Sequence, residues 1–219
     1  PRHASAIVSS MHDTALEIIE RHAHDGARLR EDFFLSQGGN LRHVALRAAA
    51  CLAVGGKLLL CGNGASAALA QHLAAEFVNR FAMDRPALPA LALSADATSL
   101  TAIGGDLDFS QIFSRQAEAL GRPGDMLLAI TASGYTANII AALEAARRGS
   151  LLAVSLCSTE SDMASHCDMA IEAPLAEPPL VHELHLAAGH MFCRLTDYYL
   201  FENAVALTPY LQGRHTTEV

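Results

Sequence analysis

A short apolar run followed by two glycines constrains the fold of this chain more than any other stretch. Leu58-Leu59-Leu60-Cys61 is typical of a buried parallel strand, and it ends at Gly62. Glycine at 62 and at 64 permits positive φ and close approach of the backbone. Good helix formers then predict a helix over 67–81, with Ser66 as its N-cap. The N-terminus of a helix placed in this way favours an anion.

Short apolar segments alternate with helical patterns along the rest of the chain. Further strands are predicted at 90–93, 126–130, 151–156 and 169–171. Helices are predicted at 98–103, 109–120 and 137–148, with a break at Gly104-Gly105-Asp106, and a last helix follows Pro178-Pro179. This alternation predicts an α/β fold: a doubly wound five-stranded parallel sheet flanked by helices, with ligands at the carboxyl ends of the strands.

Two amphipathic helices are predicted before the first strand, over 4–35 and 41–54, the second ending at Gly55-Gly56. Because they precede the strand, they either cover one face of the sheet or pack against another subunit. No repeat or composition shift marks a linker. We therefore interpret residues 1–219 as a single domain, with the N-terminal helices at 4–54 packing at subunit interfaces.

Composition excludes several classes of protein. A formal net charge of −8, from 15 basic and 23 acidic residues, argues against a nucleic-acid partner. No apolar run reaches the length of a membrane span, and no basic segment precedes an apolar one at the N-terminus, so we expect a cytoplasmic protein without a membrane partner. The five cysteines include no CxxC pair, which indicates reduced core residues.

A second turn between a strand and a helix is richer in chemistry than the first. Thr131-Ala132-Ser133-Gly134-Tyr135-Thr136 places three hydroxyls around a glycine, which suits a phosphate monoester held without Lys or Arg. The alternative is an ordinary capped helix start. Two such turns in one chain favour a phosphorylated ligand that spans both. Gly62-x-Gly64-x-x-Ala67 also fits a relaxed dinucleotide fingerprint, but Asp96 lies too far along the next strand to support it.

Four polar side chains form the constellation with catalytic potential. His72 and Glu76 stand one turn apart and share a helix face, where they can bind a metal or exchange a proton. On their own they would be a surface pair. His182 and His190 share a helix face at an axial separation of about 12 Å. One metal would join these two only if His182 lay in a loosened turn after Pro179, or if they came from different subunits.

Taken together, these residues resemble the phosphoheptose isomerases, a family within the sugar-isomerase (SIS) domain group. The resemblance covers roughly residues 40–200. It rests on Cys61-Gly62-Asn63-Gly64-Ala65-Ser66-Ala67, Gln71-His72, Glu76, residues 100–106, 113–116 and 119–125, the loop from Thr131 to Thr136, His182-Glu183-x-His185 and Gly189-His190.

The resemblance implies an activity, a cofactor and an assembly. The reaction converts sedoheptulose 7-phosphate to D-glycero-D-manno-heptose 7-phosphate, which feeds lipopolysaccharide or other surface glycans. Family members are cytosolic homotetramers with active sites between chains. The implied zinc ligands are His72, Glu76, His182 and His190. The implied substrate contacts are Asn63, Gly64, Ala65, Ser66, Glu76, Gly105, Asp106, Thr131, Ala132, Ser133, Thr136 and His182. Proton transfer through an enediol needs an acid/base pair, which we assign to Glu76 and His190.

Departures from the family pattern leave other functions open. The family usually has glycine at Ala65, asparagine at Tyr135 and glutamine at His182. One alternative is an SIS isomerase that acts on another ketose phosphate. Another is a non-catalytic scaffold that binds the replication initiator, a branch that lacks the residues matching Glu76 and His190. Since this chain keeps both, the sequence favours an enzyme.

Overall fold

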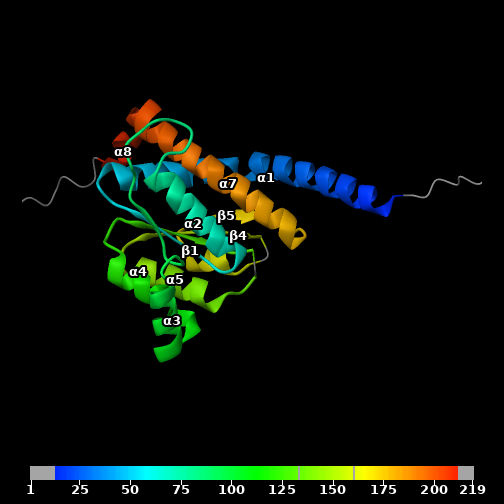
Figure 1. Cartoon of the computed structure of the whole chain (residues 1–219). Helices are drawn as coiled ribbons and strands as arrows, with labels where there is room; N and C mark the ends of the chain where they lie inside the picture. The colour runs from blue at the N-terminus through cyan, green and yellow to red at the C-terminus, as the bar shows by residue number, and fades with distance from the viewer. Residues whose placement is uncertain (1–12, 133, 160, 212–219) are drawn as a thin grey trace, which may run out of the picture.

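The computed structural model describes residues 13–132, 134–159 and 161–211. Its centre is a parallel sheet of five strands in the order β2-β1-β3-β4-β5 (Figure 1). The strands are β1 (Leu58–Gly62), β2 (Ala90–Ala92), β3 (Met126–Ile130), β4 (Leu152–Ser158) and β5 (Met169–Ala173). The predicted doubly wound parallel sheet is confirmed. The strand order reverses between β1 and β3, so the turns that follow these two strands lie side by side at the switch point where such sheets bind ligands.

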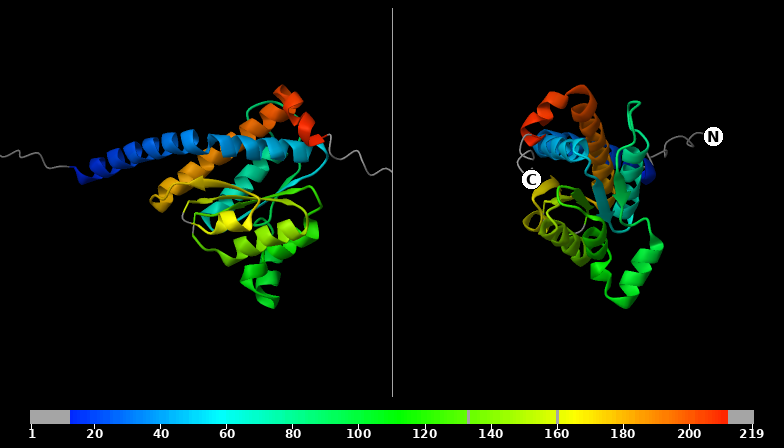
Figure 2. Two further views of the ribbon diagram at one scale, coloured as in Figure 1. Left: turned by 180° about the vertical axis from the view of Figure 1, so that it is seen from behind. Right: turned by 90° about the vertical axis from the view of Figure 1, so that its left-hand side faces the viewer.

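Helices cover both faces of the sheet. One layer holds α1 (Thr14–Ala53), α2 (Ala65–Val78) and α7 (Pro178–Asp197), and the other holds α4 (Ser114–Leu120), α5 (Ala137–Arg148) and α6 (Met163–His166), as Figure 2 shows. Alternate residues of each strand supply the two cores. In β1, Leu58 and Leu60 pack against the first layer, and Leu59 and Cys61 against the second.

The first helix differs from the prediction. The two helices expected at 4–35 and 41–54 are one continuous helix, α1, and residues 4–12 lie outside the described part of the chain. Gly38-Gly39 does not interrupt it, because Phe33, Leu41 and Val44 on either side are buried on one face. A glycine costs about 1 kcal/mol in a helix interior, which such packing outweighs. The predicted stop is confirmed, since α1 ends at Ala53.

The outer part of α1 projects from the body of the molecule (Figure 1). Its apolar side chains face solvent there, with Leu16 55% and Ile19 62% exposed.

Within the described ranges, no helix combines the length and apolar character that crossing a bilayer requires.

The bounds of the remaining elements agree with the prediction or differ from it by a few residues. Strand β3 and helix α5 match their predicted bounds. Helix α3 (Ala97–Asp106) continues through the predicted break at Gly104-Gly105-Asp106, and the predicted helix 109–120 divides into a 3₁₀ turn (Phe109–Gln111) and α4. The segment after α7 was not predicted: a π turn (Tyr198–Glu202), a 3₁₀ turn (Ala204–Leu207) and α8 (Thr208–Leu211).

The cysteines are structural, as expected. Cys51, Cys61, Cys157 and Cys193 are buried, Cys167 is partly exposed, and all five are free thiols. Burial raises the pKa of Cys61 to about 12, so this thiol is protonated and unreactive at neutral pH.

Candidate active site

The turn after β1 depends on its two glycines. Gly64 has a φ of +54° and stands directly before α2. A Cβ atom on Gly62 would lie 2.7 Å from the backbone of Ser66, so only glycine lets the strand end approach the first turn of the helix this closely. The predicted cap is wrong: α2 begins at Ala65, and Ser66 is a buried residue of its first turn. The predicted strand-turn-helix unit is otherwise confirmed.

The turn after β3 brings two hydroxyls together. Thr131 Oγ1 lies 3.4 Å from Thr136 Oγ1, and Ala132 is partly exposed between them. Ser133 lies outside the described residues. As far as the described chain shows, the Thr136 side chain makes no capping bond to α5, so the ordinary capped helix start does not account for this hydroxyl. Tyr135 is 72% exposed on the outside of the turn.

A pair of asparagines joins the two turns. Asn63 Nδ2 donates to Asn138 Oδ1 at 2.8 Å, and Asn138 Nδ2 donates to Asn63 Oδ1 at 2.9 Å. Asn138 belongs to the first turn of α5 and is 2% exposed. Sequence reasoning missed Asn138, although an amide two residues into a helix that follows a polar turn was the available signal. The reciprocal bonds hold the two turns at a fixed spacing.

Gly105 and Asp106, two of the predicted substrate contacts, lie at the end of α3. Both are exposed at the end of α3, which projects from the body of the molecule (Figure 2). Because α3 continues to Asp106, this carboxylate ends a helix rather than standing in a loop.

The packing of α2 against α7 brings three of the predicted residues together. His72 Nε2 lies 2.8 Å from His190 Nε2, and the two rings meet edge to face. His72 Nδ1 lies 3.7 Å from Glu76 Oε1. The side chains of His72 and Glu76 are 40% and 26% exposed, so all three groups are within reach of a ligand. An imidazole pair beside a carboxylate is able to take up and return protons.

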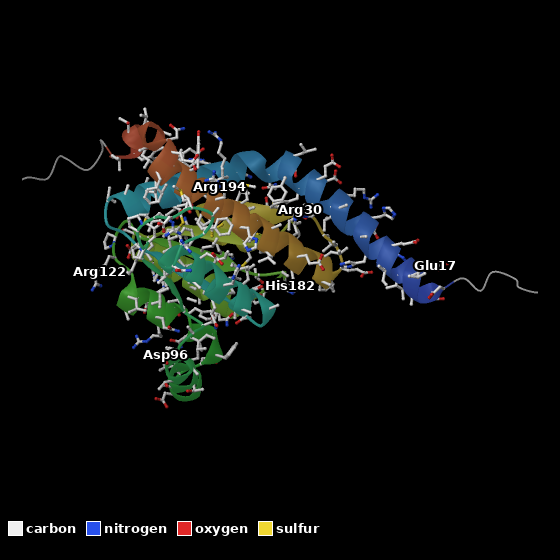
Figure 3. All side chains as sticks on the ribbon, turned by 45° about the horizontal axis from the view of Figure 1, so that its top comes forward. Glu17, Arg30, Asp96, Arg122, His182 and Arg194 are labelled. Carbon is white, nitrogen blue, oxygen red and sulfur yellow. The ribbon has the colours of Figure 1, made fainter. Side chains whose placement is uncertain are left out.

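His182 does not join this cluster within one chain. It stands near the start of α7 (Figure 3), and α7 is regular helix from Pro178 onward, so the loosened turn considered after Pro179 is absent from the structure. The rise of the helix separates it from His190 by about 12 Å. In the described residues, no three His, Cys, Asp or Glu side chains converge closely enough to hold a metal ion. Among the residues that the structure describes, one chain therefore supplies two converging nitrogens, from His72 and His190, but not a complete set of zinc ligands.

His185 is a buried group that sequence reasoning left without a role. It is 0% exposed, and neither ring nitrogen has a hydrogen-bond partner in the described part of the chain. Burial, and next the nearby His182, lower the pKa of His185 to about 4. The imidazole is therefore neutral at pH 7 and belongs to the packing between α7 and the sheet.

Gly189 permits the contact between α2 and α7. A Cβ atom there would lie 2.8 Å from Leu73 Cδ2 and 2.9 Å from Leu73 Cδ1, and Leu73 is fully buried. We expect Gly189→Ala to lower the free energy of unfolding by about 1–3 kcal/mol, because the added methyl overpacks this contact. Urea denaturation measures the change.

Gly104→Ala is the matched control for that measurement. Gly104 is also helical, but its added methyl would meet Ile112 Cγ2 at an ordinary 3.6 Å. It should stabilise the protein by about 0.5–1 kcal/mol through the loss of glycine's flexibility. If both variants shift stability in the same direction, the close approach at Gly189 is not what the packing requires.

Comparison with known proteins supports the resemblance found in the sequence. Residues 21–158 match the family model described as SIS domain. The phosphoheptose isomerase of Desulfovibrio desulfuricans is 59% identical over 209 residues, which is 95% of this chain and 100% of the relative. The phosphoheptose isomerase of Nitratidesulfovibrio vulgaris strain Miyazaki F is 49% identical over 205 residues, covering 93% of this chain and 99% of the relative.

Two solved structures extend the agreement to the fold. A phosphoheptose isomerase from Francisella tularensis superposes with a TM-score of 0.80 at 32% identity, covering 84% of this chain and 98% of that one. The phosphoheptose isomerase of Neisseria gonorrhoeae gives a TM-score of 0.76, also at 32% identity, covering 84% of this chain and 99% of that one. By sequence over nearly its whole length and by fold, the chain belongs to the phosphoheptose isomerase family of SIS-domain proteins.

Proposed function

We propose that the chain is an aldose–ketose isomerase that converts sedoheptulose 7-phosphate into D-glycero-D-manno-heptose 7-phosphate. The observation that carries the proposal is the cluster between α2 and α7, where His190 lies 2.8 Å from His72 and Glu76 stands one turn away. Relatives named phosphoheptose isomerase match over almost their full length, which supports the substrate.

The phosphate is assigned to the turns after β1 and β3. Their strands are neighbours, with Gly62 paired to Ile130 at the carboxyl ends. The Thr131 and Thr136 hydroxyls, 3.4 Å apart, would donate hydrogen bonds to the phosphate, and the helix that follows each turn would add the positive end of its dipole. The bridge between Asn63 and Asn138 keeps the spacing of this phosphate cradle constant.

The chemistry moves one proton between neighbouring carbons. A base removes a proton from C1 of the ketose, the C1–H electrons form the C1=C2 double bond, and the carbonyl electrons pass to the C2 oxygen, which is protonated to give an enediol. Loss of the proton on the C1 oxygen and protonation at C2 then give the aldose. Glu76 and His190 supply the two acid/base groups, and the proposal does not assign which of them removes the C1 proton.

Within one chain, the phosphate cradle and the acid/base pair are too far apart to bind the two ends of one substrate. Glu76 stands eleven residues beyond Ala65 on α2, about 16 Å along the helix. Nine linked atoms from C1 to phosphorus extend only about 10 Å at ordinary bond lengths. We therefore place each substrate between two copies, the cradle of one facing the pair of the other. The exposed apolar side chains of α1 support assembly, and a homotetramer is the form we propose.

Zinc is a separate part of the proposal. His72 and His190 offer two converging nitrogens, and Glu76 and His182 of the same or another copy would complete the three or four ligands that zinc takes. Bound zinc would polarise the carbonyl or hold the site's geometry. We also propose that the protein works in the cytoplasm and that its product enters the heptose branch of lipopolysaccharide or other surface glycans.

Glu76→Gln tests the reaction. The amide cannot accept the proton, so we expect kcat to fall by about 10²- to 10⁴-fold and exchange of the substrate's C1 hydrogen with deuterated solvent to stop, as followed by NMR. Glu144→Gln is the control, because Glu144 pairs with His166 on the other face of the sheet. Running wild type with C5 to C7 ketose phosphates tests the substrate; absence of any aldose product would favour the scaffold.

Mixing two inactive variants tests the shared site. Glu76→Gln keeps the cradle, whereas the double variant Thr131→Val with Thr136→Val keeps the acid/base pair but loses both cradle hydroxyls. When the two are unfolded and refolded together, about a quarter of the sites should combine two intact halves and recover activity. Each variant refolded alone is the control. No recovery in oligomers shown by mass to contain both chains would place cradle and pair in one chain.

Metal analysis tests the zinc site. Protein purified without chelator should carry about one zinc per chain, and His72→Ala should carry much less, because it removes one of the converging nitrogens. His166→Ala, which alters a histidine on the opposite helical layer, should retain the metal. Full activity in metal-free protein would restrict His72 to the hydrogen bond with His190.

A further inference from the structure

A buried ion pair joins the end of α2 to the end of α7. Arg85 Nε donates to Asp197 Oδ1 at 2.8 Å, and the two side chains are 1% and 0% exposed. Arg85 also donates from Nη2 to the Glu76 carbonyl and from Nη1 to the Phe77 carbonyl, both at 2.9 Å. The guanidinium thus binds the backbone of the residue that we assign as an acid/base group.

Each of these bonds has a clear physical role. The last carbonyls of a helix have no partner within the helix, and α2 ends at Val78. Arg85 supplies a partner for the Glu76 carbonyl, whereas the Phe77 carbonyl also accepts a hydrogen bond from the backbone N–H of Leu88 at 3.0 Å. Arginine holds several donors in one rigid plane, which fixes direction as well as distance. The last turn of α2 is therefore held in one orientation.

The partner carboxylate ties that orientation to α7. Asp197 lies two turns beyond His190 on the same helix. Between the ion pair and the imidazoles, the rings of Phe77 and Phe192 meet edge to face with their centroids 5.5 Å apart, and beside the imidazoles Leu73 lies against Gly189. These contacts occur in the same order along both segments, so the ion pair lies at the C-terminal end of the interface that carries Glu76 and His190.

Stability alone does not account for this pair. Replacing a buried ion pair by apolar residues of similar size is often neutral or stabilising. Asp197 Oδ2 is buried and has no hydrogen-bond partner in the described ranges, so the carboxylate is not fully satisfied. Packing of α2 on α7 without the pair would need only apolar contacts like that of Phe77 with Phe192.

We propose that Arg85 is a positioning residue for the isomerase reaction, held by Asp197, which fixes the last turn of α2 so that the Glu76 carboxylate keeps its place beside His72 and His190. The inference rests on the proposed function. It predicts that the pair affects turnover more than it affects stability or substrate binding.

The double variant Arg85→Met with Asp197→Leu separates the two roles. It should still fold, with an unfolding midpoint lowered by no more than the loss of the bond to the Glu76 carbonyl accounts for, because apolar residues replace the buried charges. Its kcat should fall by about 10- to 100-fold, because a displacement near 1 Å is costly to proton transfer, while KM changes less than about threefold. Exchange at the substrate's C1 should slow in parallel. The exposed pair Arg148 and Glu118, both changed to Gln, is the matched control and should leave kcat unchanged.

A second variant tests the proposal if the double variant does not fold. Arg85→Lys keeps the charge for Asp197 but lacks the fork that reaches two carbonyls, so the same loss of kcat at nearly constant KM is expected. Wild-type kcat in either folded variant overturns the proposal. Glu76→Gln is run alongside: if it still exchanges the C1 hydrogen, the proposed function fails, whereas an inactive Glu76→Gln beside a fully active Arg85 variant refutes only the positioning role.

Discussion

The close packing of α2 on α7 is the contact on which the candidate chemistry depends. Neither helix carries the acid/base cluster alone: His72 and Glu76 belong to one, and His190 to the other. Their helices approach because Gly189 has no side chain and Leu73 fills the space. Close packing makes this geometry sensitive, since protein interiors have little free volume in which to absorb a shift. The site is thus set by a helix interface as much as by the sheet.

The two halves of the proposed site use different parts of the fold. The phosphate cradle uses strand ends, where backbone amides and the hydroxyls of Thr131 and Thr136 lie at the switch point between β1 and β3. The acid/base pair uses helix faces well along α2. A sheet edge is a good place to hold an anion, but it excludes little water. Assembly of two copies would cover both halves and explain why α1 carries exposed apolar residues.

Short stretches of sequence predicted those features of the fold that depend mainly on neighbouring residues. The strand over 126–130 and the helix over 137–148 have the predicted bounds, and Gly64 has the positive φ that its turn needs. The expected gap between the helices at 4–35 and 41–54 and the glycine break at 104–106 were both wrong. Gly38-Gly39 lies in that gap, and a glycine weakens a helix without ending it when the residues on either side pack well. Ser66 was predicted to cap because serine often does, yet Gly64 already occupies that position.

Pairings across the sequence could not be predicted in the same way. His72 and His190 are 118 residues apart, and Arg85 and Asp197 are 112 apart, so no periodicity links them. Arg85 stands before a proline in a segment that reads as a turn, and Asp197 reads as a surface charge at a helix end. What distinguishes them is burial, which only the folded chain reveals. Burying Arg85 and Asp197 at 0–1% exposure costs desolvation free energy. In our proposal the pair is kept because it fixes the orientation of the last turn of α2, which apolar packing would not do.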